Sequence, residues 1–280
     1  MSTLTPYEQE ALSELRAWQE EGPGWGARLL AKPAGKAAEI VQTLIPASAL
    51  RAALEGAHRV AHKLSDSRSI LKRAGVTELK DLRAQPLELC DRLAHSVKRR
   101  SMVMAGAGGA AFGVAGAAGL VADVPALITL ALRAIVRTGL CYGEDALADR
   151  KSRLPIGVFA LASANSMEEK RAAVTALRAY AANDGLLDVA WREGVERIAE
   201  REGSKELLVF SAQRVAKSLG VNLGKRKAAE ALPVFGALVG GSVNAWYLRD
   251  VTRCARYVFQ ERFLIARHPE LASKAIEKKA

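Results

Sequence analysis

The chain has 280 residues, of which half are hydrophobic but only 5% aromatic, and its formal net charge is +11. This hydrophobic content is enough for a sizeable core and excludes overall disorder. Alanine, leucine and valine supply most of it, which favours closely packed helices over the aromatic and β-branched strands of a β-sandwich.

The strong positive charge indicates an anionic partner, either nucleic acid or a lipid head-group surface. Basic residues lie beside acidic ones along most predicted helices, without the one-sided basic face and stacking aromatics typical of nucleic-acid binding. The compact basic run is Lys98, Arg99 and Arg100, directly before an uncharged segment, and cations gather in this way beside membrane-embedded stretches. We therefore predict an anionic membrane surface or a membrane protein as partner, and no nucleic acid. A solvated helix end explains the same run comparably well.

The first predicted helix begins at Pro6, because Thr5 and Glu8 form a capping box around a proline at the first helical position. It should end before Gly22. Short amphipathic helices are expected from there to residue 100, separated by Pro33, Pro46, Gly75 and Pro86.

The composition changes at Ser101, after which no charged residue occurs until Asp123. Six glycines lie in this stretch, and a glycine costs a helix about 1 kcal/mol, so close approach of a neighbouring helix is expected to compensate. Asp123 and Pro125 predict a turn. A second apolar helix is expected from about Ala126 to Tyr142, with Arg133 and Arg137 on one face.

A similar module follows near the C-terminus, where residues 231–248 are again uncharged. Asn244 follows Gly240 by four residues, as Asp123 follows Gly119, and we interpret both places as hairpin corners. A helix to about Phe263 should complete the second hairpin. The glycines expected to pack helices together are Gly109, Gly113, Gly116, Gly119, Gly236 and Gly240.

The predicted fold is therefore all-α: a multi-helix bundle with two glycine- and alanine-rich apolar helical hairpins packed together. Three regions are expected, namely N-terminal amphipathic helices over 1–100, a core over 101–265, and a C-terminal helix or tail over 266–280. The uncharged segment reaches the roughly 20 residues of a spanning helix, but it is glycine-rich, and an embedded Asp123 would cost about 2.5–3.5 kcal/mol. A shallow hairpin, reversible membrane binding or a tightly packed soluble core remain as interpretations.

Sequence motifs for cofactors and metals fail in their context, and we predict neither a cofactor nor a metal. Residues 106–111 match a loose dinucleotide fingerprint without the surrounding βαβ pattern. Residues 224–226 lack the remaining parts of a phosphate loop, and His58 and His62 lack the glutamate of a zinc protease. Three cysteines, Cys90, Cys141 and Cys254, are too widely spaced to indicate a disulfide framework.

Two sequence patterns together resemble a known family. The first is GAAGLVADVPAL at residues 116–127 with YGED at 142–145, and the second is LGK at 223–225 with LPVFGA at 232–237. Further positions of the second pattern are Gly240, Asn244, Ala255, Phe259 and Arg262. The chain thereby resembles the EcsC protein family over roughly residues 101–264, while the first hundred residues match loosely. The resemblance implies a bacterial helical protein, often described as hydrophobic or membrane-associated, with no established reaction.

The leading functional hypothesis is a membrane-associated protein on the cytoplasmic side, peripheral to the inner membrane, whose hairpins bind lipid or a membrane protein. One alternative is an enzyme of unknown type using Asp123, Tyr142, Asp145 and Asn244, and another is a soluble helical adaptor. The candidate polar cluster comprises Asp123, Arg133, Arg137, Tyr142, Asp145 and Asn244. Within it, Asp123 and Asn244 are interpreted either as helix caps, which we favour, or as functional groups that meet between the hairpins.

Overall fold

The computed structural model describes residues 4–22, 56, 66–113, 116–146, 154–164, 166–182 and 236–271. Every regular element that it assigns in these ranges is a helix, which confirms the predicted all-α class. The elements are α1 (Pro6–Glu20), α5 (Arg68–Ala74), the 3₁₀ helix η1 (Leu79–Ala84), α6 (Leu87–Gly113), α7 (Gly116–Cys141), α8 (Leu154–Ala162), α9 (Met167–Ala182) and α13 (Gly236–Arg267).

Helix α1 begins as its sequence predicts. The Thr5 hydroxyl accepts a hydrogen bond from the backbone N–H of Glu8 at 3.2 Å, and the Glu8 carboxylate accepts one from the Thr5 N–H at 2.9 Å. One face of the helix is buried, and its Trp18 ring stacks on Tyr257 of α13 with the ring centroids 4.7 Å apart. Local capping chemistry therefore starts the helix, and aromatic packing fixes it to the rest of the molecule.

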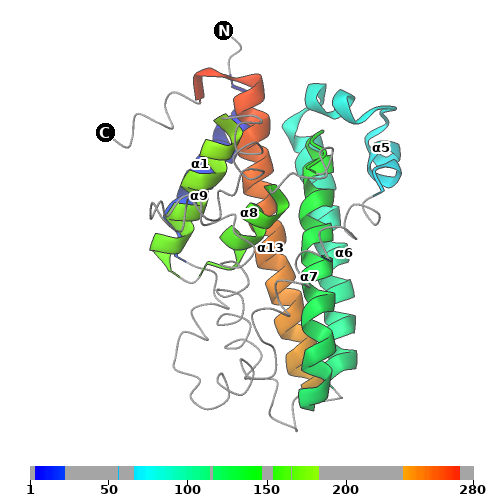
Figure 1. The fold of residues 1–280 in the computed structure, drawn as a ribbon. Coiled ribbons are helices and arrows are strands. Elements are labelled where there is room, and N and C mark those ends of the chain that lie inside the picture. Colours follow the sequence, from blue (N-terminus) through cyan, green and yellow to red (C-terminus); the bar gives the residue numbers. More distant parts are fainter. Residues whose placement is uncertain are drawn as a thin grey trace.

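Three long helices, α6, α7 and α13, form the centre of the molecule, with α1, α8 and α9 packed at one side (Figure 1). Helices α6 and α13 are antiparallel, because Gly106 lies against Gly241 at one end of the pair and Asp91 bonds Gln260 towards the other. A Cβ atom added to Gly241 would lie 2.9 Å from the backbone oxygen of Gly106. The two backbones thus approach at a spacing that only glycine at 241 permits without a shift.

The predicted hairpin corner at Asp123 and Pro125 is wrong. Helix α7 runs without interruption from Gly116 to Cys141 and contains Pro125, so the chain does not turn at Asp123 and Pro125. A proline inside a helix costs about 3 kcal/mol. Packing of α7 along α6 and α13 outweighs this local preference, as tertiary contacts commonly do.

The second predicted corner, at Asn244, is also wrong, because Asn244 lies inside the single helix α13. Residues 231–235, the start of that predicted module, lie outside the described residues. Two glycine-rich hairpins are therefore not confirmed. The change of composition at Ser101 falls inside α6, and the boundary expected at residue 265 falls inside α13, so neither interrupts a helix.

Candidate functional site

Asp123 and Asn244, which the spacing from glycine singled out, meet between α7 and α13. The Asn244 amide nitrogen donates to both carboxylate oxygens of Asp123, at 3.0 and 3.1 Å. Both side chains are buried, with exposed fractions of 3% and 1%. Neither residue lies at a helix start, so the favoured interpretation as helix caps is wrong, and the interpretation as groups that meet matches the geometry.

The other members of the predicted polar cluster lie elsewhere. The Arg133 guanidinium donates to the Met104 sulfur at 3.7 Å, and Arg137 bonds the Asp66 carbonyl oxygen and the Ser69 hydroxyl at 2.9 and 2.8 Å, next to α5. Tyr142 follows the end of α7, about 28 Å along the helix from Asp123.

Asp145 is exposed in the loop that follows. The set proposed for an enzyme, Asp123, Tyr142, Asp145 and Asn244, is therefore not brought together within the described residues.

Sequence reasoning missed a buried network centred on Asp91 of α6, which is 1% exposed. Its carboxylate accepts hydrogen bonds from the Tyr142 hydroxyl, from the Tyr7 hydroxyl at 2.8 Å, and from the Gln260 amide nitrogen at 2.9 and 3.2 Å. Burial, and then the Asp91 charge, raise the pKa of both tyrosines, so both remain neutral donors. The network joins α1, α6, the end of α7 and α13, and it gives this carboxylate the partners that its burial requires.

The YGED string covers residues 142–145. Its first three residues, Tyr142, Gly143 and Glu144, each make a structural contact. Tyr142 binds Asp91, as described above. Gly143 has a φ of +73°, and a Cβ atom there would lie 2.8 Å from the Arg83 side chain, so the turn after α7 requires glycine. Glu144 forms an ion pair of 2.7 Å with Arg262 of α13. These contacts stabilise the end of α7.

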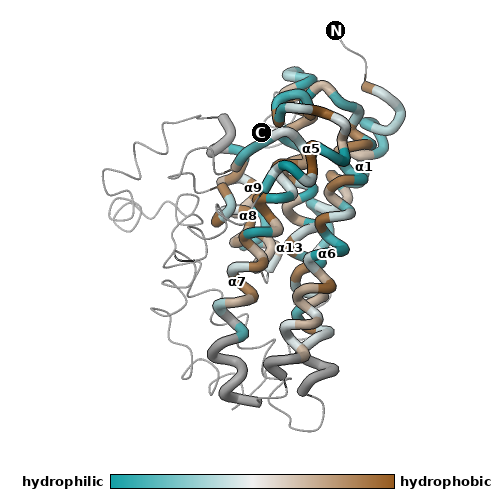
Figure 2. Tube along the Cα trace, turned by 90° about the vertical axis from the view of Figure 1, so that its right-hand side faces the viewer, coloured by the Kyte–Doolittle hydropathy of each residue, from teal (hydrophilic) through white to brown (hydrophobic). Residues whose placement is uncertain are grey.

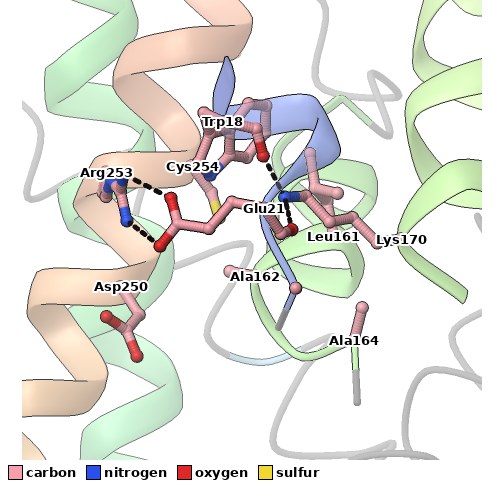
Figure 3. A pocket seen from close by; sticks show the side chains of 10 residues that line it. Trp18, Glu21, Leu161, Ala162, Ala164, Lys170, Asp250, Arg253 and Cys254 are labelled. Atoms are coloured by element: carbon pink, nitrogen blue, oxygen red, sulfur yellow. Dashed lines mark hydrogen bonds and ion pairs between the residues drawn. The ribbon is translucent and has the colours of Figure 1, made fainter. Parts of the chain in front are cut away.

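A small pocket of about 40 Å³ lies between the end of α1, α8, α9 and α13 (Figure 3). The Lys170 ammonium donates to the carbonyl oxygens of Trp18 and Glu21 and lies 4.4 Å from the Trp18 ring centre. Burial lowers the pKa of Lys170. Because these carbonyl groups end α1, Lys170 acts as a cap from a neighbouring helix, and the space beside it suits a few water molecules.

Four cationic side chains gather where α6 lies against α13, and we call them the basic seam: Lys98, Arg249, Arg253 and Arg256. Burial and then the charges of the three arginines lower the pKa of Lys98. Each arginine has an acidic partner, since Arg249 pairs with Asp250 at 3.3 Å, Arg253 with Glu21 at 2.7 Å and Arg256 with Glu14 at 3.4 Å. Among the described residues, the Lys98 amine has neither an ion pair nor a hydrogen bond.

Beyond the basic seam, the three central helices continue into an uncharged end of the bundle. This end consists of residues 101–113 of α6, 116–132 of α7 and 236–248 of α13, in which Asp123 is the single charged residue. The described part is mostly white to brown in Figure 2, whereas hydrophilic residues concentrate towards the opposite end. Val103, Met104 and Trp246 are exposed here by 73%, 49% and 38%. Large exposed hydrophobic side chains on α6 and α13 therefore follow directly after a group of cations.

Of the six glycines predicted to pack helices together, the structure describes the surroundings of one. Gly109 is buried in α6, while the surroundings of Gly113, Gly116, Gly119, Gly236 and Gly240 lie outside what the structure describes. The close approach between helices falls on Gly106 and Gly241.

Residues 106–111 of the dinucleotide-like string lie inside α6, and His58, His62 and residues 224–226 lie outside the described ranges. Within those ranges, no three histidine, cysteine or acidic side chains are placed to hold a metal, and no helix combines the length and hydropathy of a membrane span.

These features define an all-helical protein built on three long helices with an uncharged, partly exposed end. The model of the EcsC protein family matches residues 9–264, so the chain belongs to that family. The match also covers most of the first hundred residues, which by their sequence resembled the family only loosely.

A curated relative, the uncharacterized protein YdbA of Bacillus subtilis (strain 168), is 25% identical over 197 residues, which are 69% of this chain. The chain covers 64% of the length of that relative. No solved structure matches the chain significantly.

Proposed function

We propose that the protein binds reversibly to the anionic surface of a membrane, on the cytoplasmic side, through the uncharged end of its helix bundle and the cations beside it. The observation that carries this proposal is the order in which exposed cationic and apolar side chains follow one another along α6 and α13. Exposed Arg99 and Arg100 are followed on α6 by exposed Val103 and Met104, and Arg249 is preceded on α13 by exposed Trp246. Cation, tryptophan and then apolar surface is the order found at a membrane interface.

The magnitudes favour a peripheral and reversible mode of binding. Complete burial of a large apolar side chain contributes about 1.5–3 kcal/mol, and Val103, Met104 and Trp246 are already partly covered, so each contributes less. A cation near an anionic surface adds about 1 kcal/mol. Neither contribution suffices alone for stable attachment, so binding should require anionic lipid and should weaken as salt screens the charges.

Co-sedimentation with vesicles tests this proposal. The full chain is mixed with phosphatidylcholine vesicles, with or without phosphatidylglycerol, over a series of sodium chloride concentrations. We expect sedimentation with the anionic vesicles at low salt and progressive release as salt rises. Equal binding to both vesicle types would remove the role of charge, and absence of binding to either would refute the proposal.

A pair of charge reversals locates the binding surface. Arg100→Glu changes an exposed cation next to the uncharged end, whereas Arg92→Glu changes an exposed cation of the same helix about 12 Å farther from it. The Arg100 variant should lose most of the binding and the Arg92 variant much less. Equal losses would mean that net charge alone, and not this end of the bundle, drives association.

A further inference from the structure

The Lys98 amine is half-buried and lies near three arginines, and both conditions disfavour its charged form. Helices α6 and α13 are antiparallel, and their register places Lys98 beside Arg249, with Arg253 and Arg256 on the following turns of α13. Among the described residues, no acidic group pairs with the Lys98 amine, although each of the three arginines has its own carboxylate. Burial and the charges of the three arginines therefore disfavour the charged form of Lys98, and the nearby Asp250 carboxylate offsets only part of this.

An anion bound at Lys98 would remove this conflict. Arg249 is 39% exposed and holds Asp250 at the long distance of 3.3 Å, which leaves part of its guanidinium available to a second acceptor. An ammonium and a guanidinium on facing helices can bind different oxygens of one phosphate group, Lys98 as a point charge and Arg249 as a planar donor. Arg253 and Arg256 are more fully engaged, since Arg253 contacts both carboxylate oxygens of Glu21 and Arg256 stacks 4.4 Å from the Tyr257 ring centre.

The surroundings favour the phosphate of a lipid over a free anion. Trp246 precedes Arg249 by three residues on the same face of α13, about 4.5 Å closer to the uncharged end. Met102 follows Lys98 by one turn of α6 in the same direction and is partly exposed. A phosphate held by Lys98 and Arg249 would thus have an apolar path beside it for the acyl chains that it carries.

We propose that Lys98 and Arg249 form a binding site for the phosphate group of one membrane phospholipid, with Trp246 beside its glycerol backbone. This inference rests on the proposed membrane binding and adds a defined site to it. If a diffuse positive surface bound the membrane, removal of any cation at the same depth would weaken binding equally. If a defined site binds the phosphate, removal of either of the two residues that hold it weakens binding most, and the effects of the two substitutions are not additive.

Three variants of the full chain, Lys98→Met, Arg99→Met and Arg249→Gln, test the site, together with the Lys98→Met/Arg249→Gln double variant. Arg99→Met is the matched control, because it removes one positive charge from an exposed side chain one residue along α6. Dissociation constants are measured with phosphatidylglycerol-containing vesicles. We expect a weakening of about tenfold for Lys98→Met and Arg249→Gln, a clearly smaller one for Arg99→Met, and a double variant little weaker than either single.

Equal losses at positions 98 and 99, with additive losses in the double variant, would overturn the site while leaving membrane binding in place. Failure of the unchanged chain to bind the vesicles would instead overturn the proposed function. Inorganic phosphate is the competing probe: release by phosphate beyond that of sodium chloride at equal ionic strength would show a free-anion site and refute the assignment to lipid.

Thermal unfolding of the lipid-free variants separates this role from a structural one. Because its surroundings oppose the charge of Lys98, Lys98→Met should unfold at the same or a higher temperature than the unchanged chain while binding lipid less well. A lower unfolding temperature together with weaker lipid binding would indicate a structural lysine and would contradict the site.

Discussion

The close approach of the Gly106 and Gly241 backbones predicts that two glycine-to-alanine substitutions, one on α6 and one on α13, act in opposite directions. Alanine normally stabilises a helix interior by up to about 1 kcal/mol relative to glycine. At Gly106 the new Cβ atom would lie 3.6 Å from the Gly241 oxygen, an ordinary contact, so this gain should be realised. At Gly241 it would lie 2.9 Å from the Gly106 oxygen, a backbone atom that cannot move alone. Overpacking of this kind costs about 1–3 kcal/mol.

Gly241→Ala should therefore be about 1–3 kcal/mol less stable than Gly106→Ala. Gly108→Ala is the control, because nothing lies within 4 Å of its added Cβ atom. Thermal unfolding followed by circular dichroism should show a separation of several degrees, at about 2–4 °C per kcal/mol. If Gly241→Ala were as stable as the control, the antiparallel α6–α13 contact described above would be incorrect.

Three further substitutions test buried polar contacts. Tyr142→Phe removes one donor to buried Asp91 and should lower the unfolding free energy by about 1–3 kcal/mol, measured by urea denaturation. Burial of Glu8 opposes its charge, but hydrogen bonds from Thr5 and Arg267 outweigh this and lower its pKa below the ordinary 4.5.

The ionised Glu8 side chain therefore stabilises the fold above pH 4.5, and this contribution is lost as the pH falls through the lower folded-state pKa, so Glu8→Gln should flatten the acid side of the stability profile. Asp123→Asn keeps the size of the side chain but removes its charge. Near-normal thermal stability with impaired vesicle binding would show that the charge serves function, whereas unchanged behaviour in both assays would make it dispensable.

The parts of the fold that could be predicted are those with local causes. Thr5, Pro6 and Glu8 specify the start of α1 within four residues of sequence, and the structure follows them. Pro125 has an equally clear local preference, yet it lies within α7, because α6 and α13 pack against that helix. Contacts with distant segments decided between the two cases, and a single sequence does not show them.

The candidate site was predictable to a similar extent. The spacing of Asp123 and Asn244 from glycine marked a pair that does meet, although their expected position at helix starts was wrong. Asp91 gave no signal, because a carboxylate between Cys90 and Arg92 on an amphipathic helix has the pattern of an ordinary solvated charge. Its burial depends on α1, α7 and α13 converging on one point of α6.

The folded structure shows how the last charged residues of α6, α7 and α13 are placed relative to one another, which the sequence alone does not show. Arg100 is the last charged residue of α6 before the uncharged end, and Arg133 is the first charged residue of α7 after it. The two lie about 6 Å apart along the bundle, because Arg133 reaches Met104, four residues beyond Arg100 on α6. On α13 the corresponding residue is Arg249, which lies beside Lys98. The three helices therefore change from charged to uncharged within about 9 Å along the bundle, with an arginine at each boundary, although a soluble core needs no such alignment. A boundary confined to this depth is comparable to the thickness of a head-group layer, and it supports the proposed membrane binding more strongly than the overall charge does.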